Sequence, residues 1–172
     1  MKQIFAYTDG SAVVAGRDKG RGGFATYFPD LFGKRKAYSV GYLNGKTGQM
    51  EVTALLYAIR AMPKASAEAI KLIVYSDSEY VVKSFTEGRL SKWVQNGWRN
   101  SSGEVKNLEL WRNIVGELYM VRGAFLTLEM RHIRSHQVEK AKNEDEKKAL
   151  MEDPHIIGNM MADRLADYKR HK

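Results

Sequence analysis

Two acidic residues each end an apolar run of the sequence and are followed at once by a small residue. Asp9 stands in the motif YTDG, and Asp77 ends the run LIVYSD. Both runs predict buried strands, and α/β folds build functional sites at strand ends, where loops can be shaped without disturbing the core. Each acid also has a simpler interpretation. Asp9 with Gly10 is typical of a turn, and Asp77 with Ser78 is typical of a helix start.

Two further acids lie in segments with helical periodicity. Glu51 begins the first long helical segment, next to its buried apolar stripe. Asp163 lies in the last helical segment, where Asn159 precedes it by one turn on the same face. Taken alone, Glu51 would be a favourable charge at a helix N-terminus and Asp163 a solvated residue, with Asp167 as an equal rival. Periodicity shows that the four acids could face one rim of the fold, but it does not bring them together.

The chemistry of such a cluster depends on a counter-charge. Neighbouring carboxylates repel, and burial raises the cost of ionising them, so a divalent cation would have to neutralise the cluster. Hard oxygen ligands suit Mg²⁺ or Mn²⁺, particularly where phosphate oxygens complete the coordination shell. Two such ions about 4 Å apart can hold an attacking water and stabilise the leaving oxygen in phosphodiester hydrolysis.

The elements that must position these acids alternate between two periods. The runs QIFAYTD, GFATYF and KAYSVGYL predict three strands joined by turns, which implies antiparallel pairing. The later runs AIKLIVYSD and AFLTLEMRHIRS are reached through helical segments, which implies parallel pairing. We therefore expect an α/β fold with a mixed five-stranded sheet, three antiparallel strands followed by parallel strands, and helices on both faces.

Composition narrows the class of protein. The 172 residues suffice for one domain with a core, and 44% hydrophobic and 28% charged residues are typical of a globular protein. The sequence has no stretch of bilayer-spanning length, no secretory signal and no cysteine, so we expect a cytoplasmic protein without a membrane partner. The net charge of +8 favours a polyanionic partner such as nucleic acid, although general solubility explains it equally well.

Five short motifs follow one another along the chain: YTDGS, GQMEVTAL, YSDSEYV, RSHQ and NMMADRLA. In this order they resemble the type 1 ribonuclease H family, and GWRNSSGEVKNLELW is similar to that family's stretch after its basic protrusion. Each motif is short, but five in register over nearly the whole chain form a specific signal. The resemblance implies an RNase H-like fold in which residues 1–172 form a single catalytic domain.

The resemblance also implies an activity and a site. The activity is endonucleolytic hydrolysis of the RNA strand of an RNA–DNA hybrid, which leaves 5′-phosphate and 3′-hydroxyl ends and uses two Mg²⁺ ions, with Mn²⁺ as an alternative. The family's metal-binding acids match Asp9, Glu51, Asp77 and Asp163. By this correspondence Asp9 bridges both ions and Asp163 helps hold the ion that activates water. Glu51 and Asp77 hold the ion near the leaving oxygen, and Glu51 also senses the ribose 2′-hydroxyl. The motif NMMAD favours Asp163 over Asp167.

His136 matches the family's mobile histidine, which is thought to assist proton transfer or product release. Its alternative is a polar loop residue. The residues expected to contact nucleic acid are Gly10, Ser11, Thr47, Gln49, Lys92, Trp93, Trp98, Arg99 and Asn159. Gly48 offers no side chain where the family often has asparagine, which weakens the expected phosphate pocket for the DNA strand. The two tryptophans could instead anchor a small helix-turn element.

A charged insertion at about residues 138–156 separates the histidine motif from the last helix. Residues 139–153 hold four lysines and six acids. This segment could form a movable flap beside the site or a disordered surface loop.

Two other functions remain open, a nuclease of the same fold that cuts DNA and a non-catalytic nucleic-acid-binding module. The presence of all four acids favours the hydrolysis of hybrids, and we expect the enzyme to act as a monomer.

Overall fold

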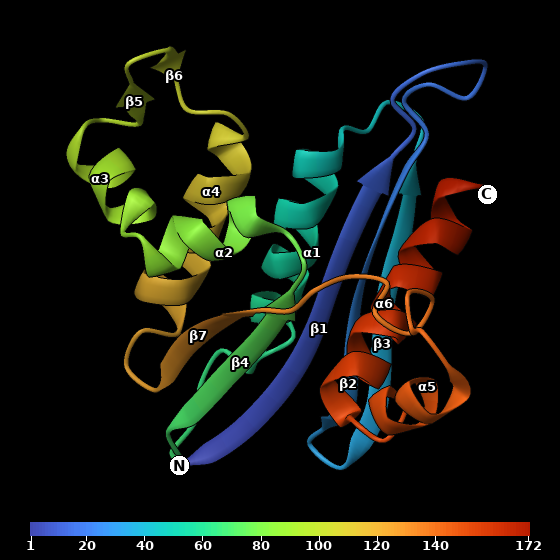
Figure 1. The fold of residues 1–172 in the computed structure, drawn as a ribbon. Coiled ribbons are helices and arrows are strands. Elements are labelled where there is room, and N and C mark those ends of the chain that lie inside the picture. Colours follow the sequence, from blue (N-terminus) through green and yellow to red (C-terminus); the bar gives the residue numbers. More distant parts are fainter.

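A mixed five-stranded sheet with helices on both faces forms the centre of the computed structural model, which describes residues 1–172 (Figure 1). The strands of this sheet are β1 (Lys2–Ala12), β2 (Gly22–Leu31), β3 (Lys34–Tyr42), β4 (Ile70–Ser76) and β7 (Leu126–His132). A separate hairpin consists of β5 (Arg99–Asn100) and β6 (Gly103–Glu104). The helices are α1 (Thr47–Arg60), α2 (Glu79–Thr86), α3 (Arg89–Gln95), α4 (Leu108–Val115), the π-helical η1 (Gly116–Val121), α5 (Glu144–Leu150) and α6 (Pro154–Arg170).

The strand order in the sheet is β3-β2-β1-β4-β7. The pairs β1–β2 and β2–β3 are antiparallel, whereas β1–β4 and β4–β7 are parallel. This confirms the predicted mixed sheet and its division into an antiparallel and a parallel part. The hairpin of β5 and β6 was not predicted, because two-residue strands are too short to produce a recognisable periodicity.

Two successive glycines in β2 show how the helices cover the sheet. A Cβ atom on Gly22 would lie 3.1 Å from the sulfur of Met50 in α1, whereas one on Gly23 would lie 2.4 Å from the carbonyl oxygen of Ala166 in α6. Because successive strand residues point to opposite faces, α1 and α6 pack on opposite faces of the sheet. Figure 1 shows the same arrangement around β1.

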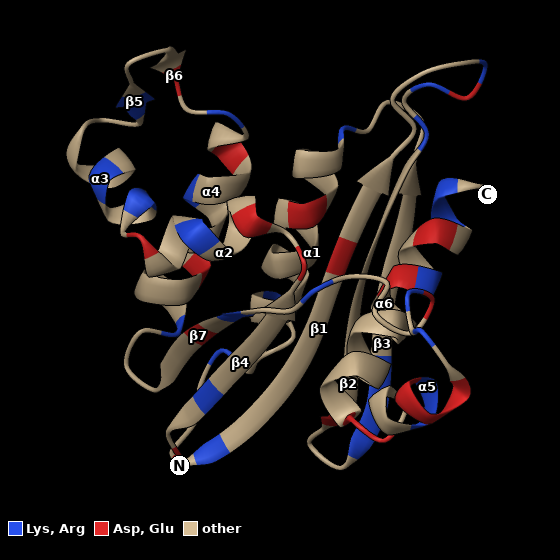
Figure 2. Cartoon of the chain, in the orientation of Figure 1, with Lys and Arg blue, Asp and Glu red and all other residues tan.

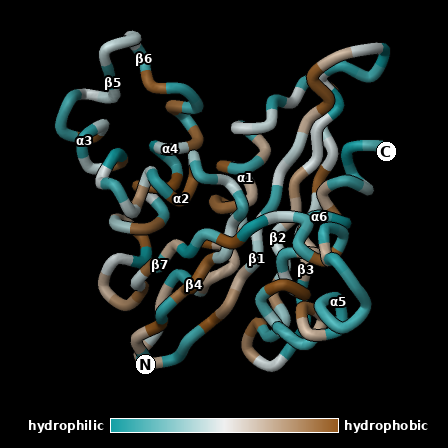
Figure 3. Tube along the Cα trace, viewed as in Figure 1, coloured by the Kyte–Doolittle hydropathy of each residue, from teal (hydrophilic) through white to brown (hydrophobic).

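The core divides accordingly. The larger cluster of buried side chains lies on the α1 face and includes Leu55, Leu72 and Trp111. A smaller cluster under α6 contains Tyr7, Tyr75 and their aromatic and aliphatic neighbours. Figure 3 shows apolar stretches along the central strands, whereas α5 and the loop leading to it are predominantly hydrophilic. No helix is both long and apolar enough to span a bilayer.

The two neighbours of β1 stop pairing with it at different residues. The parallel pairing with β4 ends at Thr8 and Ser76, but the antiparallel pairing with β2 continues to Ala12 and Gly22. Asp9 therefore lies within β1, and the expectation that it stands at the tip of the strand was wrong. It occupies the position where the parallel neighbour has already ended, so its side chain borders open space.

The charged insertion contains a short helix, α5, none of whose residues is buried. Asn143 caps this helix by accepting a hydrogen bond from the backbone of Glu146 at 2.8 Å. The Glu146 carboxylate in turn accepts one from the backbone of Lys142 at 2.7 Å. These two reciprocal bonds fix the start of α5, so the insertion is helical here rather than an irregular loop.

Candidate active site

A close contact between β1 and α1 brings the first two acids together. A Cβ atom on Gly10 would lie 2.3 Å from the backbone carbon of Met50 and 2.4 Å from the backbone nitrogen of Glu51. Only glycine allows the helix to approach the strand this closely, directly beside Asp9. Glu51 is the fifth residue of α1, so it lies in the second turn and not at the helix start as expected.

A second close contact positions α6 over the other side of β1. A Cβ atom on Gly158 would lie 2.5 Å from the ring of Tyr7, and the Tyr7 hydroxyl lies 2.7 Å from Nδ1 of His155. Asp153 caps the helix by accepting a hydrogen bond from the backbone of His155 at 2.8 Å. The start of α6 is thus fixed against the sheet, and the helix carries Asp163 to the same region as Asp9.

All four predicted acids line one cavity of about 520 Å³, which contains no hydrophobic side chain. Its lining consists of Asp9, Gly10, Ser11, Glu51, Asp77, Ser135, His136, Asp163, Asp167 and Arg170. We call it the acid cavity. The acids come from β1, from α1, from the residue after β4 and from α6, and Figure 2 shows the acidic segments of β1, α1 and α6. The fold therefore brings together side chains that periodicity alone could not.

Asp9 is the most buried of these acids, with 6% of its surface exposed. Burial raises the pKa of its carboxyl group well above the usual range, and the charge of Asp77 and a hydrogen bond with Asp163 add to the rise. The backbone N–H of Gly10 opposes the shift by donating to Oδ1 at 2.9 Å. Asp9 thus interacts with both neighbouring acids and occupies the centre of the cluster.

The carboxyl group of Asp77 is shifted in the same direction. Burial is the largest cause of its raised pKa, and the charge of Asp163 contributes to the rise. A hydrogen bond with Asp9 and the charge of His136 oppose the shift. Asp77 therefore links the acids on the strands to the loop that carries the histidine.

Glu51 has a different hydrogen-bond partner. Its Oε2 atom accepts a hydrogen bond from the Ser78 hydroxyl at 2.7 Å, which lowers the pKa. Burial outweighs this effect, and with the charge of Asp77 it raises the pKa of Glu51 to about 7. Ser78, expected only as a helix cap, does cap α2, and it also orients this carboxylate.

The crowding of these carboxylates fits a divalent cation. Their pKa values rise because negative charges are buried together, and a cation between them would remove that cost. Carboxylate oxygens are the ligands that hard divalent ions prefer. No three acids or histidines already stand as a complete set of ligands for one ion. The fit therefore rests on the chemistry of the donors and on their crowding.

His136 lies on the loop between β7 and α5 and lines the acid cavity. Its backbone has a φ of 56°, in the left-handed region that residues other than glycine seldom adopt. The imidazole is half exposed, and Nδ1 lies 3.9 Å from a carboxylate oxygen of Glu139. The ring therefore stands exposed at the rim of the cavity.

The expected nucleic-acid contacts divide into three groups, the last of which, Thr47 and Gln49, lies at the start of α1. Gly10 and Ser11 line the acid cavity, and Asn159 lies in an adjoining cavity with His136 and Asp163. Asn159 is buried, and its Nδ2 atom has no hydrogen-bond partner. The second group, Lys92, Trp93, Trp98 and Arg99, belongs to the α3–β5 region and lines none of these cavities (Figure 1).

Both tryptophans of that region pack partly against the larger core. The ring of Trp93 lies 5.5 Å from that of Trp111, and the guanidinium group of Arg112 lies 5.9 Å from the Trp98 ring. Both rings therefore anchor the α3–β5 region to the core, as the alternative interpretation of the sequence had it. Lys92 and Arg99 remain exposed.

The start of α1 borders a further cavity of about 560 Å³, which meets the acid cavity at Glu51. Its lining consists of Lys46, Gly48, Gln49, Glu51, Tyr80, Lys106 and Asn107. The side-chain oxygen of Gln49, Oε1, already accepts a hydrogen bond from the backbone of Lys46 at 3.2 Å. Thr47 lies outside this cavity, and its hydroxyl oxygen accepts a hydrogen bond from the backbone of Ala12 at 3.2 Å.

Sequence reasoning missed Ser135 and Arg170 as lining residues of the acid cavity. Arg170 lies seven residues after Asp163, which is two helical turns on the same face, so helical spacing alone could have indicated it. The Nε atom of Arg170 is buried without a partner. Asp167 also lines the cavity, but its carboxylate pairs with Arg170 and lies 3.6 Å from Nε2 of His171. These pairs distinguish it from Asp163.

Comparisons with known proteins agree with this geometry. The sequence profile of the family described as RNase H matches residues 1–170. The ribonuclease H of Lachnoclostridium phytofermentans is 35% identical over 118 residues, covering 66% of this chain and 71% of that protein.

Two solved structures have similar folds. The foamy viral protease-reverse transcriptase in complex with RNA/DNA hybrid has a TM-score of 0.71 at 20% identity, over 98% of this chain and 20% of that chain. LC9-RNase H1, described as a type 1 RNase H with the type 2 active-site motif, has a TM-score of 0.68 at 21% identity, over 99% of this chain and 72% of that chain.

Proposed function

The chain belongs to the RNase H family, and we propose that it is an endoribonuclease that hydrolyses the RNA strand of RNA–DNA hybrids. The observation that carries this proposal is the acid cavity, in which Asp9, Glu51, Asp77 and Asp163 meet from four separate segments of the chain. The hybrid-bound foamy viral structure with the same fold supports the choice of substrate. The products we propose are 5′-phosphate and 3′-hydroxyl ends.

Members of this family generally use divalent metal ions. We propose two Mg²⁺ ions at the acid cavity, with Mn²⁺ able to replace them. When bound, the ions would activate a water molecule and stabilise the charge on the leaving oxygen. Asp9 would contact both, because it interacts with Asp77 on one side and with Asp163 on the other. Asp163 would hold one ion, and Glu51 and Asp77 the other.

Glu51 is also assigned a part in choosing RNA. Ser78 holds one of its carboxylate oxygens, so the orientation of the other oxygen is fixed. A carboxylate held in this way can accept a hydrogen bond from a ribose 2′-hydroxyl, the group that distinguishes RNA from DNA. Asp9 is too buried to play this part, with 6% of its surface exposed.

His136 is assigned proton transfer or product release. Its half-exposed imidazole stands at the rim of the cavity, where it can take a proton from the reacting groups and release it to solvent. Its neighbour Glu139 can hold the protonated ring outside the cavity, which would separate the two positions of the histidine.

The substrate contacts are proposed around the acid cavity and on the α3–β5 region. Gly10, Ser11 and Asn159 border the cavity that would receive the RNA strand. The exposed cations Lys92 and Arg99 would support the other strand at a distance from the acids, together with Trp93 and Trp98, and Thr47 and Gln49 would seat its backbone near α1. We further propose that residues 1–172 act as one catalytic domain and as a cytoplasmic monomer.

The test is cleavage of a hybrid whose two strands carry different labels. Wild type should cut only the RNA strand with Mg²⁺ and neither strand with Ca²⁺. Asp9→Asn should cut neither strand, while Asp18→Asn, which changes an exposed acid in the β1–β2 turn, should keep full activity. Cleavage of a DNA duplex without cleavage of the hybrid would overturn the proposal, and so would undiminished activity of Asp9→Asn.

A further inference from the structure

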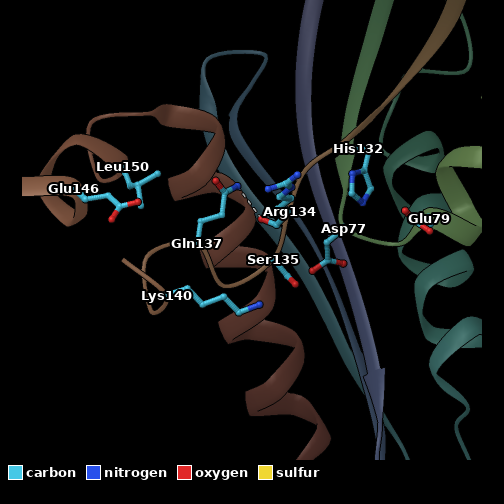
Figure 4. A pocket seen from close by; sticks show the side chains of 9 residues that line it. All are labelled: Asp77, Glu79, His132, Arg134, Ser135, Gln137, Lys140, Glu146 and Leu150. Carbon is cyan, nitrogen blue, oxygen red and sulfur yellow. Dashed lines mark hydrogen bonds between the residues drawn. The ribbon is translucent and has the colours of Figure 1, made fainter. Parts of the chain in front are cut away.

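A fourth cavity, of about 500 Å³, opens beside the acid cavity on the side of α5 (Figure 4). Its lining consists of Asp77, Glu79, His132, Arg134, Ser135, Gln137, Lys140, Glu146 and Leu150. We call it the insertion cavity, because Lys140, Glu146 and Leu150 come from the charged insertion. It shares Asp77 and Ser135 with the acid cavity, so the two cavities adjoin at these residues.

Two cations in the insertion cavity have no partner for their charge. The guanidinium group of Arg134 forms no hydrogen bond or ion pair. Only the main-chain carbonyl oxygen of this residue is bonded to a side chain, and it accepts a hydrogen bond from Nε2 of Gln137 at 2.9 Å. Lys140 bonds only through its main-chain N–H, which donates to the carbonyl oxygen of His136 at 3.1 Å. In Figure 4 both side chains lie between the α5 residues and Asp77. Their charged groups are therefore free to bind a ligand.

The acids in the same lining are already engaged. Glu146 accepts a hydrogen bond from the backbone of Lys142 at 2.7 Å, and Glu79 pairs with Lys83 at 3.4 Å. Asp77 belongs to the acid cavity and would be neutralised by the ions proposed there. Glu146 keeps its negative charge, because its partner is a neutral backbone N–H, so it offsets one of the two cations. With Glu79 paired and Asp77 neutralised, the charge left for a ligand in the insertion cavity is still positive.

We propose that the insertion cavity binds a backbone phosphate of the RNA strand close to the phosphate that is cut, with Arg134 and Lys140 as its donors. This inference rests on the proposed function. A guanidinium group can bind two phosphate oxygens at once, and an ammonium group supplies a mobile point charge beside it. Both are typical ligands of nucleic-acid phosphates.

The position of the cavity assigns the phosphate to the RNA strand. The strand that is cut must pass through the acid cavity, and the insertion cavity adjoins that cavity at Asp77 and Ser135. The cavity at the start of α1 shares only Glu51 with the acid cavity and no residue with the insertion cavity. The insertion then forms one wall of the substrate path, and capping bonds within it fix where α5 starts after Lys140.

The test measures binding without cleavage. The double substitution Arg134→Gln and Lys140→Gln is placed in Asp9→Asn protein, and the affinity for hybrid is measured in Ca²⁺ between 50 and 200 mM salt. Each lost phosphate contact should reduce the slope of log affinity against log salt by about 0.7–0.9, so the pair should reduce it by about 1.5. The affinity lost by the double variant should then be about eightfold smaller at the higher salt concentration.

The matched control is Lys142→Gln with Lys147→Gln, which removes the same amount of charge, here wholly from the insertion. Both lysines line a different cavity, on the α6 side of α5. The control should keep the slope of the parent protein. Equal slopes for the two double variants would overturn the proposal.

Hybrids that carry one uncharged methylphosphonate linkage show which strand supplies the bound phosphate. One such linkage in the RNA strand, within two positions of the cut, should weaken binding by the parent protein and leave the Arg134–Lys140 double variant unaffected. Coupling to a DNA-strand linkage, or to none, would overturn the proposal. This result is independent of cleavage. A hybrid left uncut by wild type in Mg²⁺ would refute the proposed function, whereas an unchanged salt slope would refute the phosphate site alone.

Discussion

The hydroxyl group of Tyr7 lies 2.7 Å from Nδ1 of His155, and this contact joins β1 to the start of α6. The ring of Tyr75 in β4 stacks on the same imidazole, with ring centroids 4.3 Å apart. Tyr7 precedes Asp9 by two residues, so both side chains point to the α6 face of the sheet. The contact therefore sets the position of Asp163 relative to Asp9.

Substitution of Gly158 by alanine should disturb this contact. The added Cβ would lie 2.5 Å from the Tyr7 ring, so α6 must move away from the sheet. We expect a loss of about 1–3 kcal/mol in the free energy of unfolding, measured with urea, together with weaker binding of Mn²⁺.

The control for this substitution is Gly116→Ala. Gly116 also has helical dihedral angles, but a Cβ there meets no atom within 4 Å. Alanine should stabilise the protein there by about 0.5–1 kcal/mol and leave Mn²⁺ binding unchanged. If both alanine variants behaved alike, close packing of α6 would not govern the site.

The stability of the metal-free protein should depend on pH through its buried acids. The pKa of Glu51 rises from 4.5 to about 7 on folding, and those of Asp9 and Asp77 rise as well. Between pH 4.5 and 7 the folded state thus binds more protons than the unfolded state, so the free energy of unfolding should fall as pH rises. Urea unfolding in EDTA measures this fall.

Mg²⁺ should reduce or reverse this pH dependence, because the ion binds the ionised carboxylates and its affinity increases with pH. A flat unfolding free energy over this range in EDTA would mean that the acids are not forced together in the folded protein.

Asp9→Asn should stabilise the metal-free protein while abolishing cleavage. The amide oxygen can still accept the hydrogen bond from Gly10, and the buried negative charge is removed. We expect the free energy of unfolding at pH 7.5 to rise by about 1–3 kcal/mol in EDTA. A loss of stability in EDTA would contradict the electrostatic strain inferred for the acid cavity.

Ser78→Ala should affect both the fold and the metal site. It removes the cap of α2, which costs about 1 kcal/mol, and the hydrogen bond that lowers the pKa of Glu51. Half-maximal Mn²⁺ binding should therefore shift to higher pH. Ser84→Ala is the control, because Ser84 is also buried in α2 but bonds only to the carbonyl oxygen of Tyr80. An equal shift in both variants would remove the assigned role of Ser78.

The sequence predicted the elements of the sheet well because runs of apolar, β-branched and aromatic residues mark each strand. It misplaced Asp9 at a strand tip because the end of β1 depends on pairing with β2, which continues after β4 has ended. It placed Glu51 at a helix start because the cap at Lys46 is held by Gln49 rather than by a typical capping residue. Local patterns do not contain these pairings.

The convergence of the acids was beyond the reach of periodicity for a similar reason. It depends on the close approaches at Gly10 and Gly158, which are tertiary contacts between residues distant in sequence. The resemblance to a family supplied the four acids as a set. Arg170 lies outside the quoted motifs, although helical spacing from Asp163 could have indicated it. The second role of Ser78, as the hydrogen-bond partner of Glu51, became visible only in the structure.

The most direct test of the central claim is to count bound Mn²⁺ by the loss of its free paramagnetic resonance signal. Wild type should bind Mn²⁺, and Asp9→Asn, Glu51→Gln, Asp77→Asn and Asp163→Asn should each bind it more weakly. Asp167→Asn should bind as wild type does, because that carboxylate pairs with Arg170. Unchanged binding by Asp9→Asn, or equal losses for Asp163→Asn and Asp167→Asn, would contradict a metal site built from these four acids.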